Sequence, residues 1–421
     1  MDATEISRQI FERLAARSAA PPPRIRTWAG DEWGPEDARA TLVLQHPGAF
    51  RAMLLPMTDL TAGEAYIHDD IDIAGDFSAV LEFGRGLTEA PLGAADSAQL
   101  YRLLRQLPNQ PRRGEADRPR MRGTRHSLRR DREAISHHYD TGNEFFAQFL
   151  DPRMVYSSAA FLSPADTLEE AQLRKLDLIC RKLELGPGQR LLDVGCGWGS
   201  LVAYAAEEYG ATAVGVTLSS EQASYANDLI KERGVDDRVT ILQRDYREVD
   251  GSFDAVASIG MFEHVGPTQL GVYFAHLSHM LTPTGLLLNH GIVNRDRGAK
   301  RRRLRPKANF MSTYVFPDGE LVSMDRVIDA AEGVGFELRD AESLRTSYAL
   351  TLERWIANLE SKHDAAVAAA GEKAYRIWRS YMAASALAFN TADISVYQLL
   401  LAKPDRPWVY GRARLLAADD T

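Results

Sequence analysis

The feature that most constrains the fold is a glycine-rich turn between an apolar strand and an amphipathic helix. The strand is predicted over residues 190–194 and the helix over residues 200–209. The turn between them reads Asp193-Val194-Gly195-Cys196-Gly197-Trp198-Gly199. Glycines let the backbone turn tightly and approach a ligand closely. A strand, a glycine turn and a helix in this order indicate a ligand site at the end of a parallel sheet.

The chain around this turn alternates between strands and helices. Further strands are predicted at residues 212–217, 239–244, 253–259 and 285–293, with a closing edge strand at 395–402, and helices at 168–185 and 220–233. This alternation predicts an α/β fold with a doubly wound, mostly parallel sheet. Residues 294–385 read as a mostly helical insertion, which we expect to form a lid over the site.

The spacing of the glycines discriminates between ligands. A dinucleotide site favours G-x-G-x-x-G, with the pyrophosphate at the start of the helix. This chain has G-x-G-x-G, with Asp193 two residues before the first glycine. The pattern resembles motif I of class I methyltransferases, which are Rossmann-like, and this resemblance implies a seven-stranded sheet. The pattern therefore favours S-adenosylmethionine over NAD.

The next two strands end in polar residues that can complete a cofactor site. The second strand has no acidic residue at its end for the ribose hydroxyls. Thr217 and Gln222 can supply hydrogen bonds instead, although they could equally be strand-end and helix-cap residues. After the third strand, Asp245, Tyr246 and Arg247 are expected to frame the adenine.

Composition divides the chain into two domains. Residues 1–107 are predicted to form a small α+β domain for lipid binding or dimerisation. It has a first helix at 4–17, a strand-rich stretch with apolar runs at 40–44 and 50–55, and helices at 77–87 and 98–107. Residues 108–133 are rich in arginine and proline and read as a linker, which is either a solvated connector or an arm that contacts anionic phosphates. Residues 134–421 form the predicted catalytic domain.

Charge and composition exclude several classes of protein. The net charge of −8 gives no overall attraction to nucleic acid or anionic lipid, so any such attraction must be local. Two cysteines make no disulfide framework, and no pair of His or Cys residues has the spacing of a metal site. The N-terminus lacks an apolar signal region, and no run approaches the ~20 apolar residues that span a bilayer. We therefore expect a cytoplasmic protein that meets a membrane from its inner face.

Motifs along the chain resemble those of cyclopropane-fatty-acyl-phospholipid synthases, including the tuberculostearic-acid type of fatty-acid methyltransferase. The similarity covers roughly residues 135–405, and the N-terminal G-E-A-Y run also looks like that of the longer, phospholipid-acting members. The matching runs are His138–Phe146, Leu150–Pro152, Met154–Ser158, Val194–Gly199, Gly215–Gln222, Gly260–Gly266, Leu288–Ile292, Tyr314–Gly319, Tyr348–Leu352 and Gly63–Tyr66. Several ordered motifs at the right spacing make the resemblance specific.

The resemblance implies a cofactor site and a neighbouring anion site. The residues expected to contact S-adenosylmethionine are Tyr156, Ser157, Asp193, Gly195, Gly197, Gly199, Thr217, Gln222, Asp245, Tyr246 and Arg247. A buried bicarbonate ion would be held by the elements that carry Ser158, Glu263, His290, Ile292 and Tyr348. An alkene that attacks the sulfonium methyl becomes a carbocation, and an anion pinned beside it can accept the proton that must leave. Glu263 beside that anion should be largely protonated.

Two departures from the family pattern leave the product open. Ser158 and Ser385 stand where the family commonly has cysteine, which excludes a covalent mechanism through either position. Loss of a proton from the transferred methyl would close a cyclopropane ring. A hydride shift before that loss would leave a methylene group, which a separate reductase would convert into a methyl branch. The sequence does not separate these outcomes.

Further features concern partners. A basic loop follows the strand of His290 and could bind lipid headgroups at about 1 kcal/mol per cation, or be a solvated loop. Its cations are Arg295, Arg297, Lys300, Arg301, Arg302, Arg303, Arg305 and Lys307. The resemblance also implies a homodimer and an unsaturated phospholipid acyl chain as substrate. Two alternatives stay open: a methyltransferase of a soluble small molecule, and a catalytically silent lipid-binding relative.

Overall fold

The computed structural model describes residues 1–89, 93–109, 118, 130, 141–295, 309–317 and 319–406. The chain divides into two compact units. Unit 1 comprises Met1–Arg120, Leu304–Pro317 and Ala370–Leu387, and unit 2 comprises the remainder. His138–Asp140, most of the predicted linker, the basic loop beyond Arg295, and Asp318 lie outside the described residues.

Unit 1 has a small sheet covered by helices. Its four strands are ordered β2-β1-β3-β4, where β1 and β3 are parallel and the other neighbours antiparallel. The elements are α1 (Ala3–Ala15), β1 (Arg24–Arg26), β2 (Glu32–Trp33), β3 (Ala40–Leu44), α2 (Ala49–Leu54), α3 (Asp59–Ile67), β4 (Ile71–Gly75), α4 (Phe77–Glu89) and α5 (Ala94–Gln106). Asp2 caps the start of α1 by accepting a hydrogen bond from the Glu5 amide. The helix buries Ile6, Ile10, Phe11 and Leu14.

One prediction for this unit is wrong. The sequence predicts that the apolar run 50–55 belongs to a strand-rich stretch, but this run forms most of helix α2. A short apolar run without clear alternation fits a buried strand and a buried helix equally well. In the structure Phe50 is buried in the core as part of this helix.

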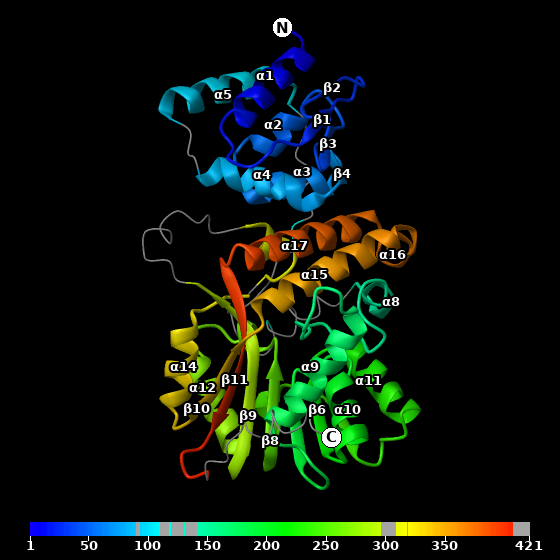
Figure 1. Cartoon of the computed structure of the whole chain (residues 1–421), viewed down its shortest axis with the longest axis vertical. Helices are drawn as coiled ribbons and strands as arrows, with labels where there is room; N and C mark the ends of the chain where they lie inside the picture. The colour runs from blue at the N-terminus through cyan, green and yellow to red at the C-terminus, as the bar shows by residue number, and fades with distance from the viewer. Residues whose placement is uncertain are drawn as a thin grey trace. The chain divides into compact units, whose positions relative to one another are not determined.

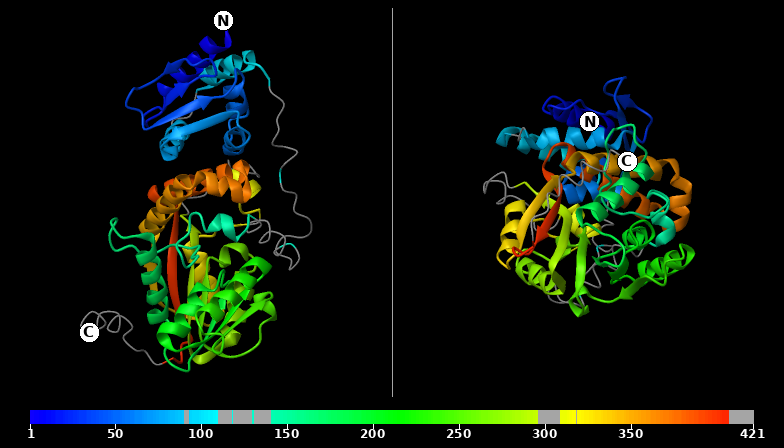
Figure 2. Two further views of the ribbon diagram at one scale, coloured as in Figure 1. Left: turned by 90° about the vertical axis from the view of Figure 1, so that its right-hand side faces the viewer. Right: turned by 60° about the horizontal axis from the view of Figure 1, so that its bottom comes forward.

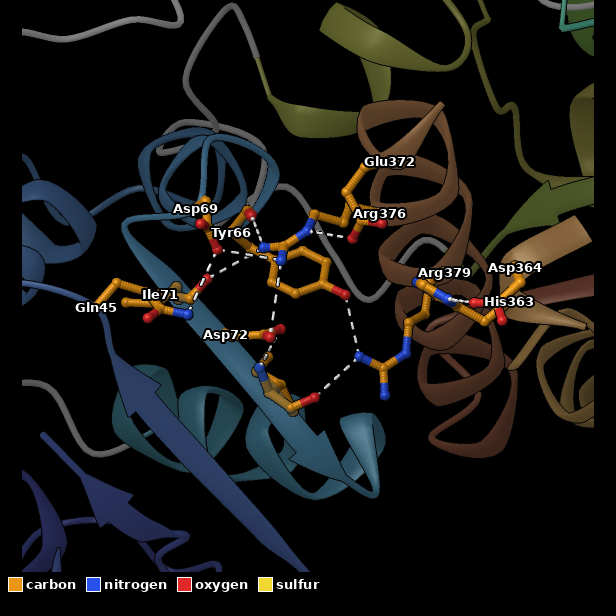
Figure 3. A network of polar contacts seen from close by, with 11 residues as sticks. Gln45, Tyr66, Asp69, Ile71, Asp72, His363, Asp364, Glu372, Arg376 and Arg379 are labelled. Carbon is orange, nitrogen blue, oxygen red and sulfur yellow. Dashed lines mark hydrogen bonds and ion pairs between the residues drawn. The ribbon is translucent and has the colours of Figure 1, made fainter. Parts of the chain in front are cut away.

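The G-E-A-Y run of α3 holds two segments that come from much later in the chain. Glu64 accepts hydrogen bonds from the Tyr314 hydroxyl at 3.0 Å and from the Arg118 guanidinium at 2.7 Å. On α17 (Glu372–Asn390), Arg379 Nη1 donates to the Tyr66 hydroxyl at 3.0 Å, and Arg376 Nη1 donates to the Tyr66 carbonyl at 2.9 Å (Figure 3). These contacts explain why residues 304–317 and 370–387 belong to unit 1.

Unit 2 contains the predicted seven-stranded, mostly parallel sheet. Its order is β10-β11-β9-β8-β5-β6-β7, and only β11 runs antiparallel to its neighbours. The strands are β5 (Arg190–Val194), β6 (Thr212–Thr217), β7 (Val239–Gln243), β8 (Phe253–Ile259), β9 (Leu281–Asn294), β10 (Glu337–Ser343) and β11 (Ile394–Ala402). The sequence therefore predicted the fold class correctly.

Helices pack on both faces of this sheet (Figures 1 and 2). One apolar core joins α9 (Leu168–Lys182), α10 (Ser200–Tyr209) and α11 (Ser220–Glu232) to one face. The other core joins α12 (Leu270–Met280) and α14 (Met324–Glu332) to the opposite face. Since both faces are covered, the central strands are buried and read as continuous apolar runs.

The closing strand is not at the edge, contrary to the sequence-based expectation. β11 lies between β9 and β10, and β10 comes from inside the predicted insertion. β10 reads Glu-Leu-Arg-Asp-Ala-Glu-Ser and is mostly exposed or half-buried, so it carries no apolar signal of a strand. Pairing with β11 supplies its backbone hydrogen bonds.

The insertion is shared between the units. Its helices are α13 (Phe310–Tyr314), α14, α15 (Arg345–Ser361), α16 (His363–Ala370) and α17. Residues 304–317 and 370–387 group with unit 1, and residues 318–369 group with unit 2. Its role as a lid stays a prediction. None of the described helices is both long and apolar enough to cross a membrane.

Candidate active site

The glycine turn lies where the chain order reverses across the sheet, between β5 and β8. Gly195, Gly197 and Gly199 all have positive φ, of 84°, 55° and 88°, which L-residues with a side chain rarely adopt. The amides of Gly195 and Cys196 both donate to the Val216 carbonyl at 2.9 Å, which fastens the turn to the end of β6. In doubly wound sheets, ligands bind at this reversal point, beyond the carboxyl ends of the strands.

Asp193 is the second-last residue of β5. Its carboxyl group is buried, and one of its two oxygens lacks a hydrogen-bond partner in the described part of the chain. It is 2% exposed, and its Oδ1 has no hydrogen-bond partner within the described chain. Burial raises the pKa of this carboxyl to about 7, while the nearby Lys175 ammonium acts to lower it. An unpartnered acceptor at the start of the glycine turn is suited to the ammonium of an amino-acid ligand.

Thr217 and Gln222 form a buried pair beside the turn. The Thr217 hydroxyl donates to Gln222 Oε1 at 2.8 Å and accepts the Ser219 amide at 3.2 Å. The Gln222 Nε2 has no partner among the residues that the structure describes. The threonine thus orients the amide, and the amide keeps donors free for a ligand. This arrangement supports the cofactor role that we predict for both residues.

Asp245, Tyr246 and Arg247 follow β7 in the short helix η1 (Tyr246–Glu248). Asp245 caps this helix, and Arg247 binds the same carboxylate through two hydrogen bonds of 2.7 Å. The Tyr246 ring packs edge-on against Tyr273 at 5.8 Å. The Asp245–Arg247 pair therefore stiffens the turn that presents Tyr246.

The Tyr156-Ser157-Ser158 segment is held by helices on two sides. From α9, Gln172 Nε2 donates to the Ser157 carbonyl and Lys175 Nζ donates to the Ser157 hydroxyl, both at 2.9 Å. From α15, Thr351 Oγ1 accepts the Ala159 amide at 3.0 Å. The Ser158 hydroxyl donates to the Ala159 carbonyl at 3.0 Å. The T of the Y-x-x-T-L run therefore ties this segment to the helix that carries Tyr348.

A chain of aromatic contacts runs from the glycine turn to Tyr348. Trp198 contacts Phe146 at 5.0 Å between ring centroids, and Phe146 contacts Tyr156 at 5.5 Å. Tyr156 stacks on Trp355 at 5.2 Å, and Trp355 meets Tyr348 edge-on at 6.1 Å. The face of an aromatic ring attracts cations, and this row of rings, the aromatic wall, extends from the glycine turn to the helix that carries Tyr348.

Glu263 is fixed on the backbone of the neighbouring strand. It lies in η2 (Phe262–His264) after β8, and its Oε1 accepts the Ile292 amide at 2.7 Å. Its Oε2 has no partner within the described residues. Burial raises the pKa of Glu263 to about 7, although the Ile292 hydrogen bond acts to lower it. The carboxyl is therefore largely protonated below neutral pH, and Oε2 can donate.

His290 lies two residues before Ile292 on β9, on the same side of the strand. Burial lowers the pKa of His290 to about 3, so the ring is neutral. Gln398 lies opposite it on β11, with its Nε2 at 3.3 Å from His290 Nδ1. If this amide donates, Nδ1 is the acceptor and Nε2 carries the proton. That Nε2 has no partner in the described part of the chain.

The structure also reveals residues that the sequence did not single out. Gln172 and Lys175 anchor the Tyr156–Ser158 segment, Gln398 contacts His290, and Trp355 links Tyr156 to Tyr348. In the sequence, the one sign of this role is that Gln172 and Lys175 are polar residues, three positions apart, on the otherwise apolar side of α9. Ser385 is 8% exposed in the part of α17 that belongs to unit 1, whereas Ser158 belongs to unit 2. No group of metal-binding side chains occurs among the described residues.

The protonation of Glu263 predicts a pH dependence of stability. Below pH 4.5 the carboxyl is neutral in both the folded and the unfolded chain. As the pH rises to about 7, the unfolded chain ionises first, and folding loses about 3 kcal/mol from this group. The loss is complete above the folded-state pKa. Replacing Glu263 with glutamine should remove this part of the decline.

Urea unfolding of both proteins from pH 4.5 to pH 7 measures the difference. Asp193 also has a raised pKa, but it contributes to both proteins and cancels in the comparison. Parallel curves for the two proteins would contradict the assigned protonation.

The sheet order and the glycine turn define a class I, Rossmann-like methyltransferase fold that binds S-adenosylmethionine. A family model described as mycolic acid cyclopropane synthetase matches residues 126–399. The chain belongs to this family and is an S-adenosylmethionine-dependent methyltransferase.

Individual relatives agree with this assignment. A Pseudomonas putida protein named probable fatty acid methyltransferase is 37% identical over 404 residues, which are 94% of this chain and 96% of the relative. The cyclopropane-fatty-acyl-phospholipid synthase of Escherichia coli (strain K12) is 39% identical over 63% of this chain and 66% of its own length. A mycolic acid cyclopropane synthase crystallised with SAH and CTAB is 34% identical, with a TM-score of 0.61 over 65% of this chain and 98% of that chain.

Proposed function

We propose that this enzyme transfers the methyl group of S-adenosylmethionine to a cis double bond in an unsaturated phospholipid acyl chain. The observation that carries the proposal is a pair of buried, unpartnered groups, one on η2 after β8 and one on β9. These are Glu263 Oε2 and His290 Nε2. Both belong to side chains that are uncharged below neutral pH.

Two neutral hydrogen-bond donors are suited to binding an anion. They are less suited to a methyl acceptor that must first lose a proton. A phenol or an amine needs a base to remove its proton, but a histidine with a pKa near 3 is a poor base at neutral pH. An alkene has no proton to lose before it attacks. The site therefore favours an alkene over the nucleophile of a soluble small molecule.

The same two groups fit a bicarbonate ion. Glu263, His290 and the elements of Ser158, Ile292 and Tyr348 would hold it, and it would supply the acceptor for the proton that leaves after methyl transfer. Glu263 is fixed for this role by the Ile292 amide, and His290 contacts Gln398. The aromatic wall from Tyr156 to Tyr348 would stabilise a cation on the acyl chain and exclude water from it.

Two products are compatible with this site. The π electrons of the alkene form the bond to the methyl carbon as its bond to sulfur breaks, which leaves a carbocation on the acyl chain. Loss of a proton from the new methyl closes a cyclopropane ring. A hydride shift before that loss leaves a methylene group, and a separate reductase would then complete a methyl branch.

The phospholipid form of the substrate rests on two observations. The E. coli relative is named as acting on acyl phospholipids, and the basic run 295–307 can contact anionic headgroups. We include peripheral contact with the inner membrane surface and a homodimer in the proposal. Nothing in the site requires nucleic acid.

Lipid mass spectrometry tests the proposal in a host that makes monounsaturated phospholipids. Expression should add the mass of one CH₂ group to those acyl chains, relative to cells with the empty vector. Proton NMR of the isolated lipid then distinguishes ring protons from methylene protons. The purified enzyme should also bind S-adenosylhomocysteine. If it does and the acyl chains are unchanged, the proposal that an unsaturated acyl chain is the methyl acceptor is refuted.

A further inference from the structure

Lys175 is a fully buried lysine beneath the Tyr156–Ser158 segment. It is 1% exposed on α9, and its Nζ donates to the Ser157 hydroxyl at 2.9 Å. Burying an ammonium is costly, and a lysine without a function is readily replaced by an apolar residue at such a position. The position of this charge therefore requires an explanation.

The surroundings of Lys175 show that α9 organises the whole segment. Gln172, one turn earlier on the same face, donates to the Val155 carbonyl at 3.3 Å and to the Ser157 carbonyl at 2.9 Å. Asp151 Oδ1 accepts the Val155 amide at 2.9 Å. The backbone of the segment is thus already fixed by neutral and carboxylate partners. Lys175 adds a contact to the Ser157 side chain rather than to the backbone.

The direction of the hydrogen bond has a chemical consequence. An ammonium can only donate, so the Ser157 oxygen is the acceptor and its own proton is directed elsewhere. No acceptor for that proton is found in the described part of the chain. Ser157 is half-buried, so its hydroxyl can still reach a ligand. Lys175 therefore makes Ser157 a donor with a polarised O–H bond.

The charges beneath the site match a zwitterion. Lys175 interacts electrostatically with Asp151 and with Asp193, and Asp193 Oδ1 is an unpartnered acceptor at the start of the glycine turn. The amino-acid end of S-adenosylmethionine carries one carboxylate and one ammonium. A donor backed by a cation and a nearby carboxylate are complementary to that pair.

We propose that Lys175 is a positioning residue for the amino-acid moiety of the cofactor, and that it acts through the Ser157 hydroxyl on the cofactor carboxylate. The inference rests on the proposed placement of Ser157 and Asp193 in the cofactor site. The inference assigns a role to Lys175, which the proposed cofactor site does not include. It does not depend on which acceptor is methylated.

A pair of ligands separates this role from a purely structural one. S-adenosylhomocysteine carries the amino-acid moiety, whereas 5′-methylthioadenosine lacks it. In Lys175→Met, calorimetry should show the Kd for S-adenosylhomocysteine raised about tenfold or more, as expected when a charge-assisted hydrogen bond is lost. The Kd for 5′-methylthioadenosine should not change. Equal weakening of both ligands, or no change in either, would overturn the proposal.

Lys182→Met is the matched control. Lys182 is a second buried lysine on α9, but its Nζ binds Glu342 at 2.5 Å and Asp340 at 3.1 Å, away from Ser157. Its loss should leave the affinity of both ligands unchanged, even if the protein is less stable. An S-adenosylhomocysteine-selective loss in this variant would show that any buried lysine of α9 has the effect, against the proposal.

Ser157→Ala keeps the proposal testable if Lys175→Met does not fold. It should show the same selective loss for S-adenosylhomocysteine, and where both single variants fold, the double variant should lose no more than either alone. A Ser157→Ala protein with unchanged affinity for both ligands would refute the proposal. Because these measurements need no lipid, failure of the lipid assay leaves their result intact.

Discussion

Replacing Glu263 with alanine is expected to abolish methyl transfer while leaving cofactor binding intact. The substitution removes the carboxyl that accepts the Ile292 amide and leaves that amide without its partner. It also removes a neutral donor from the proposed anion site. Loss of general acid–base assistance costs about 10²–10⁴ in rate, and we expect kcat to fall by at least ~10³. The glycine turn and the Thr217–Gln222 pair are made by other residues, so S-adenosylhomocysteine should bind almost as tightly.

Single-turnover measurements with unsaturated phospholipid vesicles, together with calorimetric titration of S-adenosylhomocysteine, check both halves of this expectation. Glu263→Gln is the matched variant, because an amide keeps an acceptor for Ile292 and a donor for the anion. It should retain more activity than the alanine variant. Near-normal turnover in Glu263→Ala would show that the anion site lies elsewhere.

The second large effect is expected at Gly291, which lies between His290 and Ile292 on β9. A Cβ at this position would lie 2.0 Å from the Phe262 ring, far inside contact distance. Phe262 is buried and directly precedes Glu263, so the ring cannot move without shifting η2. In Gly291→Ala the Glu263–Ile292 hydrogen bond should therefore be disturbed. We expect a loss of stability of about 1–3 kcal/mol or more, and a loss of turnover comparable to that of Glu263→Ala.

Gly271→Ala is the control for this experiment. Gly271 is in helix α12, and a Cβ there meets no atom within 4 Å. Alanine should leave activity unchanged and keep or slightly raise the melting temperature. Thermal unfolding and turnover of both variants give the comparison. A Gly291→Ala enzyme with normal stability and turnover would mean that Phe262 can move freely, and that η2 does not hold Glu263 in place.

Much of the sheet was predictable because its central strands are bounded apolar runs. The strands predicted at 190–194 and 253–259 coincide with β5 and β8. The glycine turn was recognisable because its backbone requirements are local to seven residues. β10 was not predictable, since its polar sequence becomes a strand only by pairing with β11. The apolar run of α2 was ambiguous for the opposite reason, because its burial is compatible with either element.

The sequence by itself determined the class of fold, the position of the cofactor turn and the set of candidate residues, because these depend on neighbouring residues and short spacings. The tertiary structure alone decided how the candidates act. The contact of Glu263 with Ile292, of His290 with Gln398, and of Ser157 with Lys175 joins residues on different elements. Their protonation states follow from burial, which is a property of the packed chain. Hydrogen-bond partners and solvent exclusion arise only when distant segments meet, so a linear sequence does not specify them.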